Sequence, residues 1–176
     1  MGRLRRIWRH LWMNEVDTLR AVPDDMAERL RSRIAASERR HSGEIRICVE
    51  AVLSPGQAWQ VDGDGAGRCQ LIRDRALQWF GQLGIWDTEQ NNGVLVYLLL
   101  ADRAIEIVAD RGLARLVPQG AWQAIVDRLA SHLQDGEFET GLTQALEEVS
   151  ALLVEHFPVA AGKSTPNELP DAIVRV

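Results

Sequence analysis

Residues 93–100 read GVLVYLLL, residues 101–103 read ADR, and residues 104–109 read AIEIVA; this stretch decides the fold. The first run is apolar at every position, which is typical of a central strand covered on both faces. The link of three residues is too short for a crossover connection, so the two runs must pair as an antiparallel hairpin. The stretch therefore predicts a hairpin whose first strand lies inside a sheet.

A second strand is predicted upstream, over residues 44–52. Ile45, Ile47 and Val49 alternate there with polar residues, as in a strand with one buried face. A loop and a helix over residues 68–83, closed by Gly84, separate this strand from the hairpin. Two strands joined through a helix are parallel with a right-handed crossover. We therefore expect a mixed sheet of three strands with residues 94–100 in the middle.

Helical stripes of apolar residues flank these strands. One helix is predicted to start at Pro23, and two more follow the hairpin, over residues 122–133 and 138–153. Helices on both faces of a small mixed sheet make a three-layer αβα sandwich, which is the fold class predicted here. Residues 173–176 are expected either to add an edge strand or to remain loose.

Composition narrows the class of protein. The chain has 176 residues, enough for one domain, and a net charge of −5 with a pI near 5.4, which argues against nucleic-acid binding. No apolar run is long enough to span a bilayer, and the basic start lacks the apolar core of a signal peptide. Cys48 and Cys69 have no partner at metal-ligand spacing and are interpreted as reduced thiols. These features predict a cytoplasmic protein.

The chain divides by composition into three parts. Residues 1–22 form a basic amphipathic helix and linker, residues 23–157 form the domain, and residues 158–176 form a tail expected to be mobile. In the first part, arginines stand beside a face of tryptophans and leucines, the pattern of an interfacial anchor attracted by anionic lipid. The alternative is that the stripe packs on its own domain. The candidate contacts to a protein partner or an anionic membrane are Arg3, Arg5, Arg6, Trp8, Arg9 and Trp12.

Motifs for catalysis are absent or in the wrong context. Lys163 ends a sequence similar to a phosphate-binding loop, but the required upstream glycine, strand and helix are missing. Cys69 and Arg75 have the spacing of a cysteine phosphatase loop, yet the residues between them continue a predicted helix. The residues therefore favour a non-catalytic protein.

Acidic residues gather at the two rims of the predicted sheet. Asp102 lies in the hairpin turn, on the rim of the loop that carries Asp62 and Asp64, whereas Asp110 lies on the opposite rim. Glu89 and Asn92 precede the central strand on the same rim as Asp110. Carboxylate and amide oxygens suit a hard cation such as calcium, so the candidate metal ligands are Asp102, Asp110, Asn92 and Glu89. The alternative is that these are ordinary turn residues.

The segment 86–95 (WDTEQNNGVL), with LADR at 100–103, DRGL at 110–113 and DGEF at 135–138, resembles a TPM domain over roughly residues 25–157. The basic start and the tail resemble a short bacterial subgroup of that family, whose domain was formerly labelled a phosphatase. The resemblance implies an αβα sandwich, calcium binding in some members, weak acid phosphatase activity in a plant member, and accessory roles in others. Val108 and Ala114 stand where the family often has glutamates, which weakens the implied cation site.

These observations together predict a soluble TPM-domain protein that acts as a non-catalytic interaction or accessory module. Its expected partner is a protein or an anionic membrane surface, contacted through the N-terminal helix, and its expected ligand is a divalent cation, chiefly Ca²⁺. The alternative hypothesis is a divalent-cation-dependent hydrolase similar to an acid phosphatase.

Overall fold

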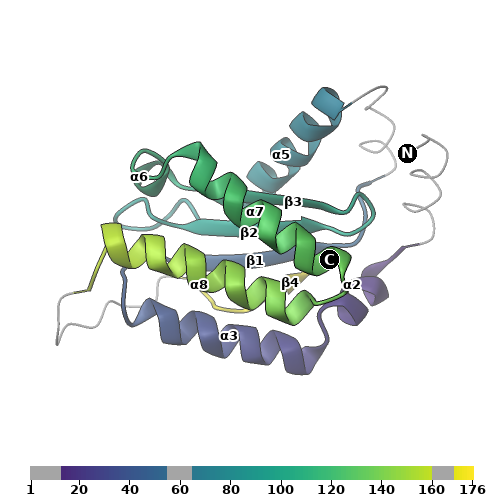
Figure 1. Ribbon diagram of the computed structural model, residues 1–176, viewed down its shortest axis with the longest axis horizontal. Helices are drawn as coiled ribbons and strands as arrows, with labels where there is room; N and C mark the ends of the chain where they lie inside the picture. The colour runs from purple at the N-terminus through teal and green to yellow at the C-terminus, as the bar shows by residue number, and fades with distance from the viewer. Residues whose placement is uncertain (1–12, 55–64, 160–168) are drawn as a thin grey trace.

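The computed structural model describes residues 13–54, 65–159 and 169–176. In these residues a mixed sheet is covered by helices on both faces, as the sequence predicts (Figure 1). The strands are β1 (Ile45–Glu50), β2 (Val94–Leu99), β3 (Ala104–Ala109) and β4 (Val174–Arg175). The helices are α2 (Glu15–Ala21), α3 (Asp24–Glu38), α5 (Gly65–Gln82), α6 (Arg111–Ala114), α7 (Gln119–Gln134) and α8 (Phe138–His156).

The sheet has the order β3-β2-β1-β4. β2 pairs in parallel with β1, with Ile45 opposite Val94, and antiparallel with β3, with Val94 opposite Ala109. The central hairpin and the parallel crossover are thus confirmed. β4 adds to the outer edge of β1, with Cys48 opposite Val174, so the final residues form an edge strand.

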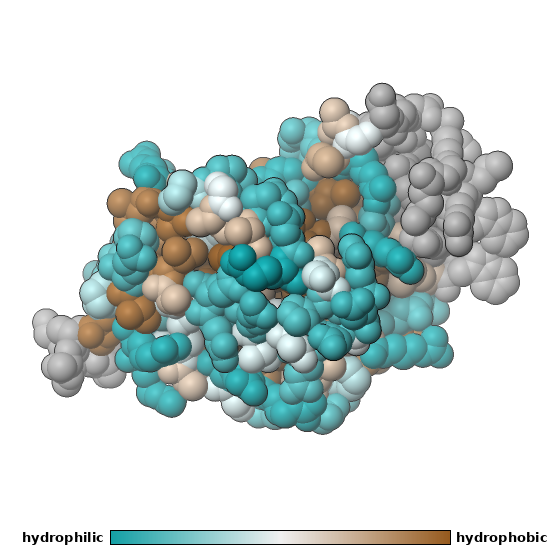
Figure 2. Space-filling view, in the orientation of Figure 1, coloured by the Kyte–Doolittle hydropathy of each residue, from teal (hydrophilic) through white to brown (hydrophobic). Residues whose placement is uncertain are grey.

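The central strand separates two apolar cores. Val96 and Leu98 pack with α3, α7 and α8, whereas Leu95 and Leu99 pack with α5 and the C-terminal residues. All six residues of β2 are buried, because alternate side chains point to opposite faces and both faces are covered. This is the αβα arrangement expected from the apolar run. The helical face in Figure 2 is largely hydrophilic, apart from an apolar area over α6 and the adjoining ends of α7 and α8.

The structure differs from the sequence-based expectations in three places. The polar face of β1 is not exposed: Arg46 and Glu50 are buried, because α5 and the C-terminal residues cover that side of the strand. Part of the predicted N-terminal linker is helix α2, whose first turn is capped by Asn14 and Asp17 in a reciprocal capping box. α5 begins at Gly65, three residues before its predicted start at Arg68.

Several predicted features lie outside the described residues. They are the basic segment with Arg3, Arg5, Arg6, Trp8, Arg9 and Trp12, the loop with Asp62 and Asp64, and Lys163. Among the helices that the structure describes, none has the length and apolar character needed to cross a membrane.

Candidate functional site

The structure places the four predicted metal ligands at opposite ends of the central hairpin. Asp102 lies in the turn between β2 and β3, whereas Asp110 follows β3 at the other end, where its N–H donates a 2.8 Å hydrogen bond to the carbonyl of Gly93. Asn92 precedes Gly93 and is therefore close to Asp110. Strands of this length separate the two ends by roughly 20 Å. A single ion therefore cannot bind both Asp102 and Asp110.

Two glycines allow the chain to close tightly at the open end of the hairpin. A Cβ on Gly93 would lie 2.2 Å from the carbonyl oxygen of Ile85, and one on Gly112 would lie 2.5 Å from that of Asn91. The N–H of Gly112 donates to the same Asn91 carbonyl at 2.8 Å, and Arg111 Nε donates to Asn91 Oδ1 at 3.0 Å. The loop before β2 is thereby fixed to the turn after β3.

Asn92 and Asp110 each present one oxygen that no other described residue satisfies. Asn92 is fully buried; its N–H donates to Thr88 Oγ1 and its Nδ2 donates to Ser42 Oγ, both at 3.1 Å. Asp110 Oδ1 accepts a 2.6 Å hydrogen bond from the N–H of Arg111. Asn92 Oδ1 and Asp110 Oδ2 are buried and have no hydrogen-bond partner in the described part of the chain. Such oxygens are suited to a hard cation or to bound water.

The charge available at this end of the hairpin is small. Glu89 is exposed, and Val108 and Ala114 bring no carboxylate. Within residues 13–54, 65–159 and 169–176, no group of three or more His, Cys, Asp or Glu side chains is placed to hold a metal ion. Calcium takes six to eight oxygens. Asn92 and Asp110 offer one amide oxygen and one carboxylate oxygen, which is far fewer than such an ion takes.

Asp102 is part of an ion pair at the other end of the hairpin. Its side chain is only 3% exposed, and its Oδ1 lies 3.1 Å from Nη2 of Arg68 on α5. The same arginine donates to the backbone carbonyl of Asp102. The carboxylate therefore holds the start of α5 against the hairpin turn.

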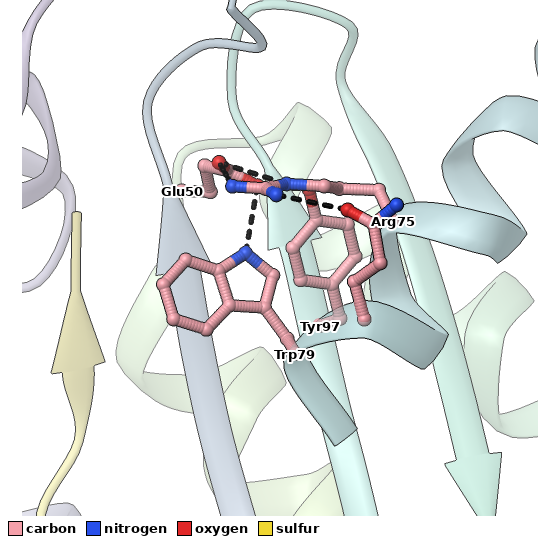
Figure 3. A network of polar contacts seen from close by, with 5 residues as sticks. Glu50, Arg75, Trp79 and Tyr97 are labelled. Atoms are coloured by element: carbon pink, nitrogen blue, oxygen red, sulfur yellow. Dashed lines mark hydrogen bonds and ion pairs between the residues drawn. The ribbon is translucent and has the colours of Figure 1, made fainter. Parts of the chain in front are cut away.

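A buried polar network, which the sequence did not predict, lies between the sheet and α5 (Figure 3). Its centre is Glu50, at the end of β1, whose side chain is 5% exposed. Arg75 donates to Glu50 through Nε, at 3.1 and 3.0 Å from the two carboxylate oxygens, and through Nη2 at 2.5 Å. Trp79 Nε1 and Tyr97 Oη donate to Glu50 Oε2 at 3.0 and 2.6 Å. The Arg75 guanidinium also lies 5.1 Å from the centroid of the Trp79 ring.

The network shifts the proton affinity of its members. Burial and the Glu50 charge raise the pKa of Tyr97, and the hydrogen bonds that Arg75 donates to Glu50 raise the pKa of Arg75. Burial, with the nearby Glu50 charge, raises the pKa of the Cys48 thiol to about 12. Cys48 is therefore held protonated and unreactive at neutral pH.

The spacing of Cys69 and Arg75 has a structural explanation. Both residues lie on α5, where Cys69 is exposed and Arg75 is bound to Glu50. The residues between them continue the helix, as predicted, and do not form a loop around an anion. The one signal for the network in the sequence was the pair Arg75 and Trp79, which share a helix face with the buried Ala76 and Phe80 nearby.

Comparisons with known proteins agree with this architecture. A family model described as TPM domain matches residues 16–152. An NMR structure of the BA42 protein from the psychrophilic bacterium Bizionia argentinensis is 24% identical and has a TM-score of 0.72, covering 88% of this chain and 95% of that one. The N-terminal domain of a protein from P. gingivalis is 23% identical with a TM-score of 0.56, covering 78% and 82%. No curated protein matches the chain.

Proposed function

The chain belongs to the TPM domain family, and from this premise we propose that it acts as a non-catalytic binding module. The observation that carries the proposal is that the Glu50 carboxylate is fully hydrogen-bonded within the protein. This buried carboxylate lies at the end of a parallel strand, the position where α/β folds commonly build their sites. It accepts hydrogen bonds from Arg75, Trp79 and Tyr97, so its oxygens are engaged within the protein.

Two other titratable groups near this edge, among the described residues, are engaged within the protein. Asp102 is paired with Arg68, and the Cys48 thiol is buried and protonated. General acid–base or nucleophilic catalysis needs a group that reaches substrate in the right protonation state. Side chains that are held in contacts within the protein stabilise the fold and are not available to a substrate. This supports a binding role over a catalytic one.

The contact surface is proposed to include the N-terminal segment, on the evidence of its sequence. Residues 1–12 contain four arginines and no acidic residue, and Trp8 and Trp12 stand among them. Arginine and tryptophan together suit the interface of an anionic membrane, where the cation is attracted and the ring is partly buried. We therefore assign Arg3, Arg5, Arg6, Trp8, Arg9 and Trp12 to contact with an anionic lipid surface, with a protein partner as the alternative.

Vesicle co-sedimentation tests this assignment. The full chain is expected to bind phosphatidylcholine vesicles that contain phosphatidylglycerol, to bind pure phosphatidylcholine less, and to lose binding as salt rises. Replacing Arg3, Arg5, Arg6 and Arg9 by glutamine should abolish binding. A matched control replaces the surface residues Arg20, Arg31, Arg33 and Arg115 by glutamine and should retain it. Equal loss of binding in both variants would contradict a specific role for the N-terminal segment.

A second candidate function is binding of a divalent cation at the open end of the hairpin. The specific observation is the pair of buried oxygens, Asn92 Oδ1 and Asp110 Oδ2, that lack hydrogen-bond partners in the described residues. Glu89 is proposed to add an outer contact. With one buried carboxylate, the affinity for calcium should fall in the weak range of about 10⁻⁴–10⁻³ M.

A calcium titration followed by NMR tests this second function. Shifts are expected at residues 89–93 and 110–112 and should disappear in the Asp110→Asn variant, which keeps a good helix cap while losing the charge. Asp87→Asn is the control, because Asp87 is exposed in the same loop but has no place in the proposed site. Shifts centred on Asp102 would contradict the assignment.

The hydrolase alternative makes a different prediction. It requires turnover of a phosphomonoester that depends on a divalent cation and is lost on Asp102→Asn or Asp110→Asn exchange. Turnover of that kind, in protein purified to constant specific activity, would overturn the non-catalytic proposal. Turnover lost instead on Cys69→Ser would point to the thiol.

A further inference from the structure

An apolar groove lies at the end of the fold that carries the turn of the β2–β3 hairpin, and residues from three parts of the chain line it. Figure 1 shows that α2, this turn and the junction of α7 with α8 lie at the same end. Its volume is about 560 Å³, within the range of ~300–1,000 Å³ found for ligand pockets. Met13 and Ala21 line it from the region of α2, Leu100 and Ile105 from the hairpin, and Leu133 and Phe138 from α7 and α8. A second hollow of about 480 Å³ shares Ala21 and Phe138 with the groove and extends it.

The surroundings of the groove are suited to cover by an apolar segment. Val16 and Leu19, three positions apart on α2, are 50% and 44% exposed, so this helix presents two large apolar side chains to solvent on one face. The charged side chains at the groove are mixed: Asp17 and Arg103 both line it, and Asp17 is bonded to Arg20 and to the Asn14 N–H. The match to an occupant is therefore carried by the apolar side chains of the lining.

Residues 1–12 of the chain are such a segment, and they are followed directly by Met13, which lines the groove. Met13 lines the groove and is the first described residue, so residue 12 must lie within one peptide bond of it. The preceding residues carry four arginines, no acidic residue, and apolar side chains listed as Leu4, Ile7, Trp8, Leu11 and Trp12. We propose that the groove is the docking site for residues 1–12 of the same chain. The proposal rests on the proposed function, since this is the segment assigned to membrane contact.

Docking in the groove gives that contact a regulatory step. The same apolar side chains cannot lie in the groove and in a lipid interface at once, so the two sites compete for the segment. If the segment is free in only a fraction of the molecules, the apparent affinity of the protein for vesicles is lowered by that fraction. Disrupting the groove should therefore release the segment and strengthen vesicle binding.

Limited proteolysis of the full chain tests the proposal, because Arg3, Arg5, Arg6 and Arg9 are trypsin sites within the segment. The groove variants are Leu133→Asp and Ala130→Glu, two partly exposed positions that line it. Ala151→Asp, exposed on α8 away from the groove, is the matched control. Cleavage after Arg31, on the surface of α3, and the thermal unfolding curve report whether each variant is folded.

In a folded groove variant, cleavage within residues 1–12 is expected to be about tenfold faster than in the wild type and the control, with vesicle affinity raised by a similar factor. Equal cleavage rates in all the folded proteins would overturn the docking. Faster cleavage without vesicle binding by any variant would support the docking and overturn the membrane role. Equal cleavage rates together with vesicle binding that depends on the arginines would overturn the docking and support the membrane role.

Discussion

The Tyr97 hydroxyl donates a 2.6 Å hydrogen bond to Oε2 of Glu50, and both side chains are buried between the sheet and α5. This contact joins β2 to β1 within the core that contains Cys48 and Phe80. A buried carboxylate is tolerated only when hydrogen bonds and an opposite charge compensate for its lost hydration. Arg75 supplies the charge, so the network functions as a unit that fixes α5 to the sheet.

Removing the centre of this network should be more damaging than removing one donor. Glu50→Ala leaves the Arg75 charge and the Tyr97 hydroxyl without their partner, and we expect a loss of about 3–5 kcal/mol in the free energy of unfolding. Tyr97→Phe should lose about 1–3 kcal/mol. Glu106→Ala is the control, because its pair with Arg73 is partly exposed and should contribute no more than about 1 kcal/mol. Urea unfolding measures all three, and similar losses for Glu50→Ala and Glu106→Ala would contradict a cooperative network.

A buried histidine makes the stability depend on pH. His41 is fully buried, with Nδ1 3.0 Å from the carbonyl of Gly43 and Nε2 3.2 Å from Ser150 Oγ. Burial lowers the pKa of His41 from 6.5 to about 4, the Arg40 charge adds to this, and the Gly43 hydrogen bond opposes it. Between these two pH values the unfolded chain binds a proton that the folded chain does not, so His41 destabilises the fold as the pH falls from about 6.5 to 4.

The His41→Asn variant should therefore have a shallower loss of stability in acid. The difference between wild type and variant is expected to change by about 3 kcal/mol between pH 7 and pH 4. His132→Asn is an informative comparison, because a hydrogen bond that His132 donates to Glu137 raises the pKa of this partly exposed histidine and gives the opposite sign of pH dependence. Thermal unfolding across this pH range gives the measurement. Parallel curves for wild type and His41→Asn would show that His41 does not titrate as proposed.

Glu38 should lower the stability of the fold as the pH rises, whereas His41 lowers it as the pH falls. Burial, together with the Glu44 charge, raises the pKa of Glu38 to about 9, and one of its oxygens accepts from the N–H of Ile45 at 3.2 Å. Above pH 4.5 the unfolded chain has lost a proton that the folded chain retains, so stability falls as the pH rises toward 9. Glu38→Gln keeps an acceptor for Ile45 and should be more stable than wild type by about 1–3 kcal/mol near pH 8. Glu28→Gln, exposed on the same helix, should show no such gain.

The framework of the fold was predictable because it depends on local pattern and chain length. The apolar run of β2 and the short link at Asp102 determine the hairpin, and the intervening helix determines that β1 is parallel. The burial of Arg46 and Glu50 was not predictable in the same way. The alternation of polar and apolar residues in β1 is equally compatible with a polar face that is exposed and with one that is covered. The polar face is covered by α5 and by C-terminal residues more than a hundred positions away in the chain.

The candidate cation site was only partly predictable. Strand register was sufficient to place Asn92 and Asp110 on one rim and Asp102 on the other. That one oxygen of Asn92 and one of Asp110 are buried without a partner in the described residues depends on close backbone contacts, which alternation and spacing do not encode. The assignments to Arg3, Trp8 and the rest of the N-terminal segment remain predictions for the vesicle experiment.

Gly93 should be the least replaceable glycine at the open end of the hairpin. A Cβ there would lie 2.2 Å from the carbonyl oxygen of Ile85 and 2.7 Å from its side chain, so Gly93→Ala must displace the loop that precedes β2. We expect a loss of about 2–4 kcal/mol in the free energy of unfolding, as for other overpacked sites, and broadened NMR signals at Asn92 and Asp110. Gly81→Ala is the control: this residue lies within α5 with nothing near its Cβ position, and alanine should stabilise the helix by about 0.5–1 kcal/mol. A Gly93→Ala protein as stable as wild type, with the Asn92 and Asp110 signals unchanged, would show that this close approach does not hold the rim together.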